Sequence, residues 1–393
     1  MSVQFGVVLP TRTRPAPLPL PELLAIAADI DASPGLGQLW VPDSILALPY
    51  YDSTVLLAAV AATTSRVKLG VACLASLGFR HPVIVAREWA NLDALSGGRM
   101  ILVACPGNAT GTAVEKELGV FGLGYPEKVE RFEENVGFLR HASAADGAFD
   151  YHGKHVTVTD LTLRPAFIQR PLPIWMAGNP SPSAGPQTID RVLGRVARLG
   201  AGWMTYNVAP DALRARNARL TELRAALGDT RPDYPVSVFL NTNVNPDENV
   251  AYRDAAARWA QQSTRNITAE DLRHIGAIGT PQQAAAFIVD LIEAGATHIA
   301  FELLATDPRR QLALITEHLL PLLPPGQALV LDPGQAPGAW PGSGPPPDAG
   351  GRPGSRVPLP RRSGHRPDSR RHDRCCRGGR ESQPSRSGRR TRG

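Results

Sequence analysis

The chain has 393 residues, of which 43% are hydrophobic and 20% are charged, so it can bury the core of one large domain or two ordinary ones. Its net charge of +6 arises in residues 326–393, which carry 14 Arg and 5 acidic residues, because residues 1–325 carry 28 basic and 31 acidic residues. The mildly acidic larger part gives no electrostatic reason to expect nucleic acid, and no run of about 18 apolar residues predicts a membrane span.

Short apolar runs recur along the first 325 residues, and each is typical of a buried parallel strand. We expect strands at Gln4–Leu9, Leu39–Pro42, Val67–Leu74, Met100–Cys105, Pro173–Gly178, Ala201–Tyr206, Val236–Val244 and His298–Leu304.

Segments with apolar residues at helical spacing lie between these runs. We expect helices at Glu22–Asp31, Ser53–Thr64, Pro82–Leu95, Pro126–His141, Ile189–Arg198, Pro210–Leu227, Ala251–Thr264, Pro281–Ala294 and Pro308–Leu322. The Gly-rich passage after Cys105 is expected to be a loop, and Phe149–Thr159 a hairpin outside the main sheet.

Strands that alternate with helices over about 320 residues predict a (β/α)8 TIM barrel, here over residues 1–325 with insertions. An open doubly wound sheet is the alternative, but the first predicted strand lacks a Gly-rich dinucleotide fingerprint. Residues 326–393 contain 11 Pro, 13 Gly and 14 Arg, so we expect a disordered tail. An unstructured extension is the favoured interpretation of this tail, and an RNA-binding or acid-binding segment is the alternative.

Two cysteines, Cys73 and Cys105, lie in apolar strand-like runs, while Cys375 and Cys376 are adjacent in the tail. This pattern is no disulfide framework, so we expect the first two to be small buried side chains and the protein to be cytoplasmic. No HExxH, paired CxxC or metal-ligand cluster occurs in residues 1–325, so no metal is expected.

Four segments carry a family resemblance: LWVPDS, VKLGVACL, RHPVIVAREWANLDALSGGRMILV and PIWMAG. Together they are similar to the luciferase-like flavin monooxygenases and their deazaflavin (F420)-dependent relatives, over roughly Val3 to Leu323. The resemblance implies a non-proline cis peptide bond between Ala72 and Cys73, in a bulge behind the cofactor ring.

In a (β/α)8 barrel, reacting groups lie at the carboxyl ends of the strands. This rule selects Thr11, Asp43, Ala72–Leu74, Gly107-Asn108, Gly178-Asn179, Tyr206-Asn207, Asn241 and Glu302.

Asp43 and Asn108 are the two candidate catalytic residues, and both are also candidate cofactor contacts. Asp43 is expected to accept hydrogen bonds or a proton, with capping of the next helix or loop as the alternative. The resemblance places a histidine where this chain has Ser44. In the sugar-phosphate dehydrogenases of the deazaflavin branch it places a catalytic carboxylate where this chain has Asn108.

The remaining candidate cofactor contacts fall into two groups. Ala72, Cys73 and Gly107 are expected near the ring. The resemblance places the cofactor phosphate against the loop of Ala177, Gly178, Ser181 and Ser183, where free N–H groups at a helix start favour an anion.

The sequence therefore predicts an oxidoreductase that transfers hydride between F420 and a small organic substrate. One alternative is an FMNH2-dependent monooxygenase, with FMN in place of F420 and a partner flavin reductase. A second alternative is a non-catalytic flavin-binding barrel. The resemblance also implies a homodimer.

Overall fold

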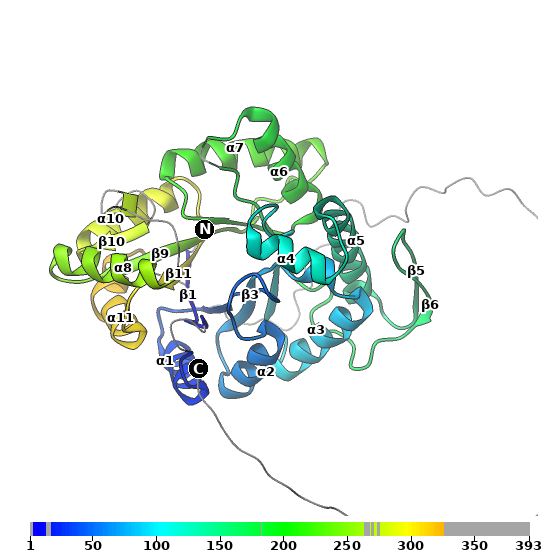
Figure 1. Ribbon diagram of the computed structural model, residues 1–393, viewed down its shortest axis with the longest axis horizontal. Helices are drawn as coiled ribbons and strands as arrows, with labels where there is room; N and C mark the ends of the chain where they lie inside the picture. Colours follow the sequence, from blue (N-terminus) through cyan, green and yellow to red (C-terminus); the bar gives the residue numbers. More distant parts are fainter. Residues whose placement is uncertain are drawn as a thin grey trace, which may run out of the picture. The chain divides into compact units, whose positions relative to one another are not determined.

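A closed barrel of parallel strands surrounded by helices forms the body of the protein (Figure 1). The computed structural model describes residues 3–12, 17–181, 183–262, 268, 271–272 and 276–325. The predicted disorder of residues 326–393 lies outside the described residues.

Eight described strands close the barrel, because β8 pairs with β9, β9 with β11, and β11 with β1. In barrel order they are β1 (Gln4–Val8), β2 (Gln38–Val41), β3 (Lys68–Leu74), β4 (Met100–Ala104), β7 (Ile174–Ala177), β8 (Trp203–Tyr206), β9 (Val236–Val244) and β11 (His298–Leu303). All of these pairings are parallel. The predicted (β/α)8 barrel is confirmed.

Helices lie on the outside of the barrel (Figure 1). The described helices are α1 (Leu20–Ala32), α2 (Ser53–Thr63), α3 (Pro82–Ser96), α4 (Thr112–Val120), α5 (Tyr125–Ala144), α6 (Pro186–Leu199), α7 (Pro210–Ala226), α8 (Glu248–Gln262), α10 (Pro281–Glu293) and α11 (Pro308–Leu314), together with short turns at Leu77–Phe79, Ile315–Leu319 and Leu320–Leu322. None of them is long and apolar enough to cross a membrane.

Three elements depart from or refine the expected order. The predicted loop after Cys105 contains α4, so that expectation was wrong. The extra strand β10 (Gly276–Gly279) pairs with the end of β9. The hairpin of β5 (Phe149–His152) and β6 (Thr157–Leu161) is separate from the barrel sheet, as predicted.

Local turn chemistry explains several helix ends. The Asp52 carboxylate caps α2 by accepting a hydrogen bond from the Val55 amide at 3.0 Å. Thr280 and Gln283 form a capping box at the start of α10. The helix α3 ends at Gly97, whose φ of 68° suits a left-handed cap.

Large side chains fill the barrel interior. The rings of Trp40 and Trp175 lie 5.7 Å apart, with Val103 and Met204 buried in the same cluster. Gly70 faces Trp40, and a Cβ atom at this position would overlap the Trp40 ring. The interior is therefore solid, and a ligand can enter only at an end of the barrel.

Arg99 links α2, α3 and the starts of β3 and β4 from a buried position. Its Nε donates to the Ser96 carbonyl at 2.7 Å, and its Nη1 donates to the Val67 carbonyl at 2.9 Å. Its Nη2 donates to the carbonyls of Ala61 at 3.2 Å and Thr64 at 2.8 Å. The guanidinium thereby satisfies carbonyl groups that end α2.

Arg99→Met is expected to lower the free energy of unfolding by about 3 kcal/mol or more, because buried carbonyls lose a charged donor. Arg214→Met on α7 is the matched control, since the Arg214 side chain is 55% exposed and pairs with the exposed Asp211. Urea unfolding of both variants measures the difference. Equal losses in the two variants would contradict the role assigned to Arg99.

His298 begins β11 inside the barrel, with its ring 4.9 Å from the Trp175 ring. Its Nδ1 lies 2.7 Å from the Thr297 hydroxyl. Burial lowers the pKa of His298 from 6.5 to about 4, because the charged imidazolium loses its hydration. The folded protein therefore holds His298 neutral at pH values where the unfolded chain protonates it.

Folding stability is accordingly expected to fall as the pH drops from 6.5 towards 4, by roughly 2 kcal/mol from His298. The unfolded chain gains a proton in this range and the folded protein does not. His298→Gln cannot titrate and is expected to flatten this part of the curve. Urea unfolding midpoints at pH 7.5 and 5 measure the effect. If His298→Gln loses as much stability between these pH values as the wild type, the pH dependence of stability belongs to other groups.

Candidate active site at the carboxyl end of the barrel

A cleft of about 510 Å³ opens at the carboxyl ends of β3, β4, β7 and β8. Its volume falls in the range of small-molecule sites. Six of the nine candidate catalytic and cofactor-binding residues line it: Ala72, Cys73, Gly107, Asn108, Ala177 and Gly178. A larger cavity of about 610 Å³ lies at the other end, beside Val3, Val236 and Thr297, where the barrel strands begin. The first cleft has the placement that barrel enzymes use.

The end of β3 forms one wall of the cleft. The peptide bond between Ala72 and Cys73 is cis, which confirms the expectation drawn from the resemblance. The register between β3 and β4 shifts between Ala72 and Leu74, so Cys73 is the residue in the bulge.

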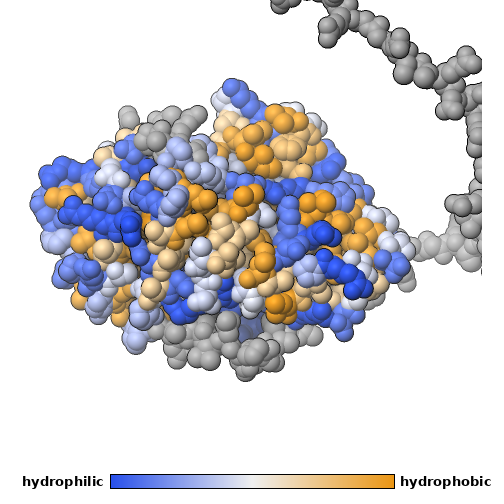
Figure 2. Space-filling model, turned by 90° about the horizontal axis from the view of Figure 1, so that it is seen from below, coloured by the Kyte–Doolittle hydropathy of each residue, from blue (hydrophilic) through white to orange (hydrophobic). Residues whose placement is uncertain are grey.

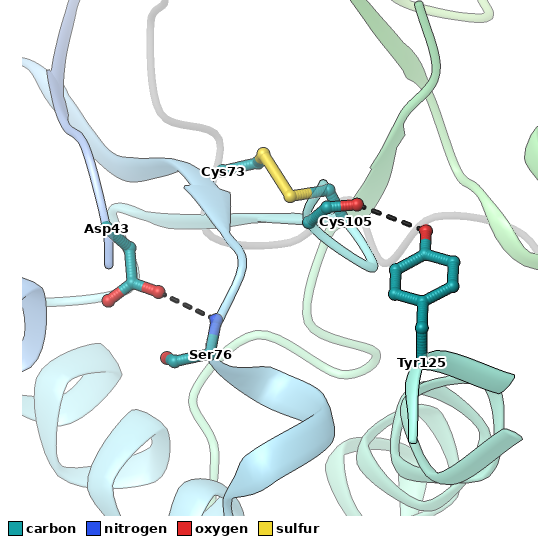
Figure 3. Close-up of a disulfide and its surroundings, with 6 residues drawn as sticks. Asp43, Cys73, Ser76, Cys105 and Tyr125 are labelled. Atoms are coloured by element: carbon teal, nitrogen blue, oxygen red, sulfur yellow. Dashed lines mark hydrogen bonds between the residues drawn. A yellow bond between two sulfur atoms is a disulfide. The ribbon is translucent and has the colours of Figure 1, made fainter. Parts of the chain in front are cut away.

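Cys73 forms a disulfide with Cys105, so the expectation of two free thiols was wrong (Figure 3). The Cα atoms lie 5.8 Å apart, within the ordinary range for a disulfide. The cysteines are 32 residues apart in the chain, and only the β3–β4 register brings them together. With these two cysteines joined, free thiols no longer support the expectation of a reducing compartment.

The loop after β4 forms the neighbouring part of the wall, because β4 pairs with β3. Gly107 has a φ of 73°, a backbone conformation that favours glycine, and Asn108 follows it with an exposed side chain. The Tyr125 hydroxyl at the start of α5 donates to the Gly107 carbonyl at 3.2 Å (Figure 3). Below this loop, Lys128 is 1% exposed and its Nζ lies 4.1 Å from the centre of the Phe79 ring. Burial lowers the pKa of Lys128.

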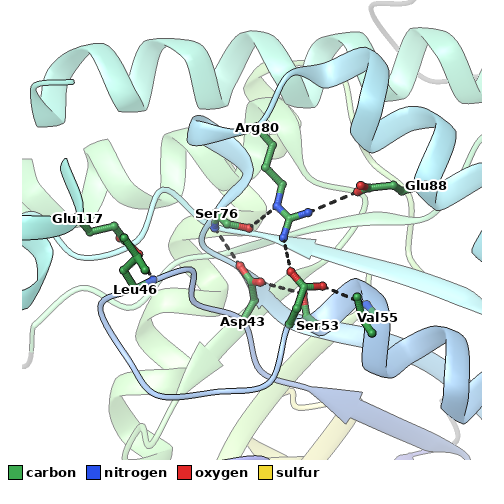
Figure 4. Close-up of polar contacts among 9 residues, drawn as sticks. Asp43, Leu46, Ser53, Val55, Ser76, Arg80, Glu88 and Glu117 are labelled. Carbon is green, nitrogen blue, oxygen red and sulfur yellow. Dashed lines mark hydrogen bonds and ion pairs between the residues drawn. The ribbon is translucent and has the colours of Figure 1, made fainter. Parts of the chain in front are cut away.

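Asp43 is buried next to the cleft but is not among the residues that line it. Its Oδ1 accepts a hydrogen bond from the Ser53 hydroxyl at 2.8 Å, and its Oδ2 accepts one from the Ser76 amide at 2.9 Å (Figure 4). These contacts join the loops after β2 and β3, and they are of the kind expected from the capping alternative. The Ser44 hydroxyl accepts from the Leu48 amide at 2.9 Å in the same loop.

Further ion pairs surround Asp43 and hold the same loops (Figure 4). Arg80 pairs with Asp52 at 2.9 Å and with Glu88 at 3.4 Å. The Glu117 carboxylate on α4 accepts hydrogen bonds from the Leu46 amide at 2.8 Å and the Ala47 amide at 3.1 Å. The polar groups that support this rim are thus largely occupied by one another.

The loop between β7 and α6 leads away from the cleft. The Gly178 carbonyl accepts from the Trp203 indole at 2.8 Å, and a Cβ atom on Gly178 would lie 2.8 Å from Val196 Cγ2. Ser181 and Ser183 are exposed farther along, with their hydroxyls 3.0 Å apart. Among the described residues, no side chain caps the start of α6. Its first residue, Pro186, has no amide hydrogen, and the Thr188 and Ile189 amides donate to the Gly185 carbonyl at 3.0 and 3.2 Å, which leaves the Gln187 amide for an anion.

Three cleft residues come from helices, and the sequence interpretation missed all of them. Tyr125 begins α5, whereas Val192 and Arg195 lie on α6, where the Arg195 Nε donates to Glu133 at 2.7 Å. The strand-end rule cannot find residues of this kind. Tyr206, which that rule does select, lies on the wall formed by β8.

A second polar group of the rim lies across the barrel mouth. A small cavity there is lined by Arg12, Tyr50, Arg258 and Glu302. Burial raises the pKa of Tyr50 to about 12 and also raises that of Glu302, which Arg12 and Arg258 partly offset. Among the described residues, no group of His, Cys, Asp and Glu is arranged to hold a metal ion.

The residues of the cleft fit a flavin or deazaflavin. Gly107 and Gly178 line the cleft without a side chain, and the Gln187 amide at the start of α6 suits a phosphate. The fold and this site define a (β/α)8-barrel protein with a ligand cleft at its carboxyl rim.

The chain belongs to the luciferase-like monooxygenase family, whose model matches residues 3–298. An F420-dependent glucose-6-phosphate dehydrogenase from Amycolatopsis mediterranei is 24% identical over 74% of this chain and 90% of its own length. An FMNH2-dependent dimethylsulfone monooxygenase from Pseudomonas putida is 24% identical over 64% of this chain and 75% of its own length. Relatives with either cofactor occur, as the sequence predicted, and the protein is an oxidoreductase.

Solved structures share the fold. An F420-dependent secondary alcohol dehydrogenase in complex with an F420-acetone adduct superposes with a TM-score of 0.68 at 17% identity, covering 82% of this chain and 100% of that one. The oxygenating constituent of 3,6-diketocamphane monooxygenase from Pseudomonas putida, in complex with FMN, gives a TM-score of 0.64 at 17% identity and the same coverage.

Ser183→Asp tests whether the loop before α6 holds an anion. The added carboxylate is expected to weaken binding of FMN and F420 by about tenfold or more, because it repels a phosphate at the helix start. Ser183→Asn has nearly the same size without the charge and serves as the matched control. Fluorescence titration measures both affinities, and equal affinities for the two variants would remove this loop from the phosphate site.

Proposed function

We propose that the protein transfers hydride between F420 and a small organic substrate at the carboxyl rim of the barrel. The observation that carries this proposal is the cleft of about 510 Å³, which joins the β3 bulge, the Gly107 loop and the Gly178 turn. The F420-dependent dehydrogenases among the relatives support F420 over FMN.

When bound, F420 supplies or accepts the hydride, and the chain supplies binding and orientation. Ala72 and Cys73 support one face of the ring, and Gly107 lets the backbone approach it closely. Gly178 and the loop of Ser181 and Ser183 direct the phosphate towards the start of α6. Tyr206 and Phe239 line the wall beyond Met204, where they exclude water from the reacting face.

The substrate is expected to differ from a sugar phosphate. Asn108 has no titratable group at the position where the resemblance places a catalytic carboxylate, and Ser44 stands in place of a histidine. An amide at Asn108 can orient a hydroxyl or carbonyl oxygen by hydrogen bonding, but it cannot take up the proton. Asp43 is the carboxylate next to this wall, with both of its oxygens already bonded.

An FMNH2-dependent monooxygenase is the second candidate, supported by the dimethylsulfone monooxygenase among the relatives. In that case a separate flavin reductase would supply the reduced cofactor.

We also infer a homodimer from the family resemblance. The molecule seen from the side of α1, α2 and α3 has apolar side chains interspersed with charged ones (Figure 2), and Val55 on α2 is 72% exposed.

Fluorescence titration of the full chain with F420, and separately with FMN, tests the choice of cofactor. We expect F420 to bind about tenfold more tightly than FMN or better. Reduced F420 bound to the protein should then be oxidised by a ketone or another reducible small molecule in a substrate panel. Tighter binding of FMN would favour the monooxygenase, and binding of neither cofactor would contradict the proposal.

A further inference from the structure

The Cys73–Cys105 disulfide is part of the cleft wall itself. Both cysteines line the cleft, one from the bulge of β3 and the other directly after β4 (Figure 3). The disulfide lies where the cofactor is proposed to bind, so a ligand in this cleft would contact it.

The surroundings of the disulfide leave the cleft as its route to solvent. Cys105 is 8% exposed and Cys73 is partly exposed, whereas the flanking Val103, Ala104 and Leu74 are at most 1% exposed. The strands and the packed barrel interior lie behind the sulfur atoms. A reductant must therefore be small and must enter through the cleft.

We propose that Cys73 and Cys105 form a reducible disulfide site in the wall of the cofactor cleft, which small thiols reach only through that cleft. An occupant of the cleft then protects the disulfide from reduction. The identity of the natural occupant rests on the proposed function, whereas the reducible disulfide site and its access route do not.

The reaction is ordinary thiol–disulfide exchange. A thiolate of dithiothreitol attacks one sulfur, the Cys73–Cys105 bond breaks, and a mixed disulfide forms with one cysteine while the other leaves as a thiolate. The second thiol of dithiothreitol then displaces that cysteine. Dithiothreitol is oxidised to its cyclic disulfide. Each cysteine thiolate takes up one proton from solvent or from the reductant, so both cysteines end as thiols. Two electrons pass from reductant to protein.

Reduction changes the cleft as well as the cysteines. Bonded sulfur atoms lie about 2.05 Å apart, and two thiols cannot remain at that distance. The ends of β3 and β4 must therefore adjust where Ala72 and Gly107 face the cleft. Cofactor binding and reduction of the disulfide affect each other by the same free energy. A cofactor that binds more tightly to the disulfide form therefore makes the disulfide harder to reduce.

Differential alkylation measures this site in the full chain. Free thiols are blocked with one label, disulfides are then reduced under denaturing conditions and blocked with a second label, and mass spectrometry of the peptides assigns each cysteine. In protein isolated under air, Cys73 and Cys105 should carry the second label. When the folded protein is treated with dithiothreitol before the first labelling step, Cys73 and Cys105 should carry the first label instead. The labels on Cys375 and Cys376 are measured separately in the same digest.

Asn108→Trp tests the access route without any cofactor, because Asn108 is an exposed residue of the cleft rim. The larger side chain is expected to slow reduction by about tenfold. Asn249→Trp is the matched control, since Asn249 is exposed at the start of α8 and is not a cleft residue. Saturating FMN or F420, whichever the titration shows to bind, should slow reduction of the wild type similarly.

Free thiols at Cys73 and Cys105 in the air-isolated protein would overturn the inference. Reduction of Asn108→Trp at the rate of Asn249→Trp would also overturn it, since that result means access by unfolding or by another route. Slowed reduction in Asn108→Trp together with no binding of either cofactor would support the reducible disulfide site and contradict the proposed function. Circular dichroism confirms that both variants are folded.

Discussion

Closure of the parallel sheet is the constraint on which the site depends. Once β8 pairs with β9, and β11 with both β9 and β1, the carboxyl ends of all eight strands face one rim. Side chains such as Trp40 and Trp175 fill the interior below that rim. A ligand is therefore confined to the rim loops, whose bases are fixed by the strands.

The paired ends of β3 and β4 show how the barrel strands shape the cleft. A bulge at Cys73 brings this residue beside Cys105, and the disulfide ties the two strand ends together. The loop that follows is held by Tyr125 through its hydrogen bond to the Gly107 carbonyl, and Lys128 is buried beneath it. The disulfide, the Tyr125 hydrogen bond and the buried Lys128 thus fix the position of this part of the cleft wall. A wall that is held in place before the ligand arrives is what preorganised binding requires.

Much of this architecture could be predicted from the sequence. Buried parallel strands are short apolar runs, so all eight barrel strands were found, and the quoted motifs identified the cis bond before Cys73. The α4 helix was missed because glycines at its flanks suggested a loop, and β10 was missed because Gly276–Gly279 carries little apolar signal. The disulfide depends on a strand register that no local pattern encodes. The same holds for Tyr125 and Arg195, which reach the cleft from helices.

We propose that the cofactor binds at the carboxyl rim, although the larger cavity lies at the opposite end beside Val3 and Val236. A crystal structure of the full chain with F420 would show which of the two cavities the cofactor occupies. We expect the ring between Ala72 and Tyr206, with the phosphate at the start of α6. F420 in the cavity at the opposite end of the barrel would contradict it.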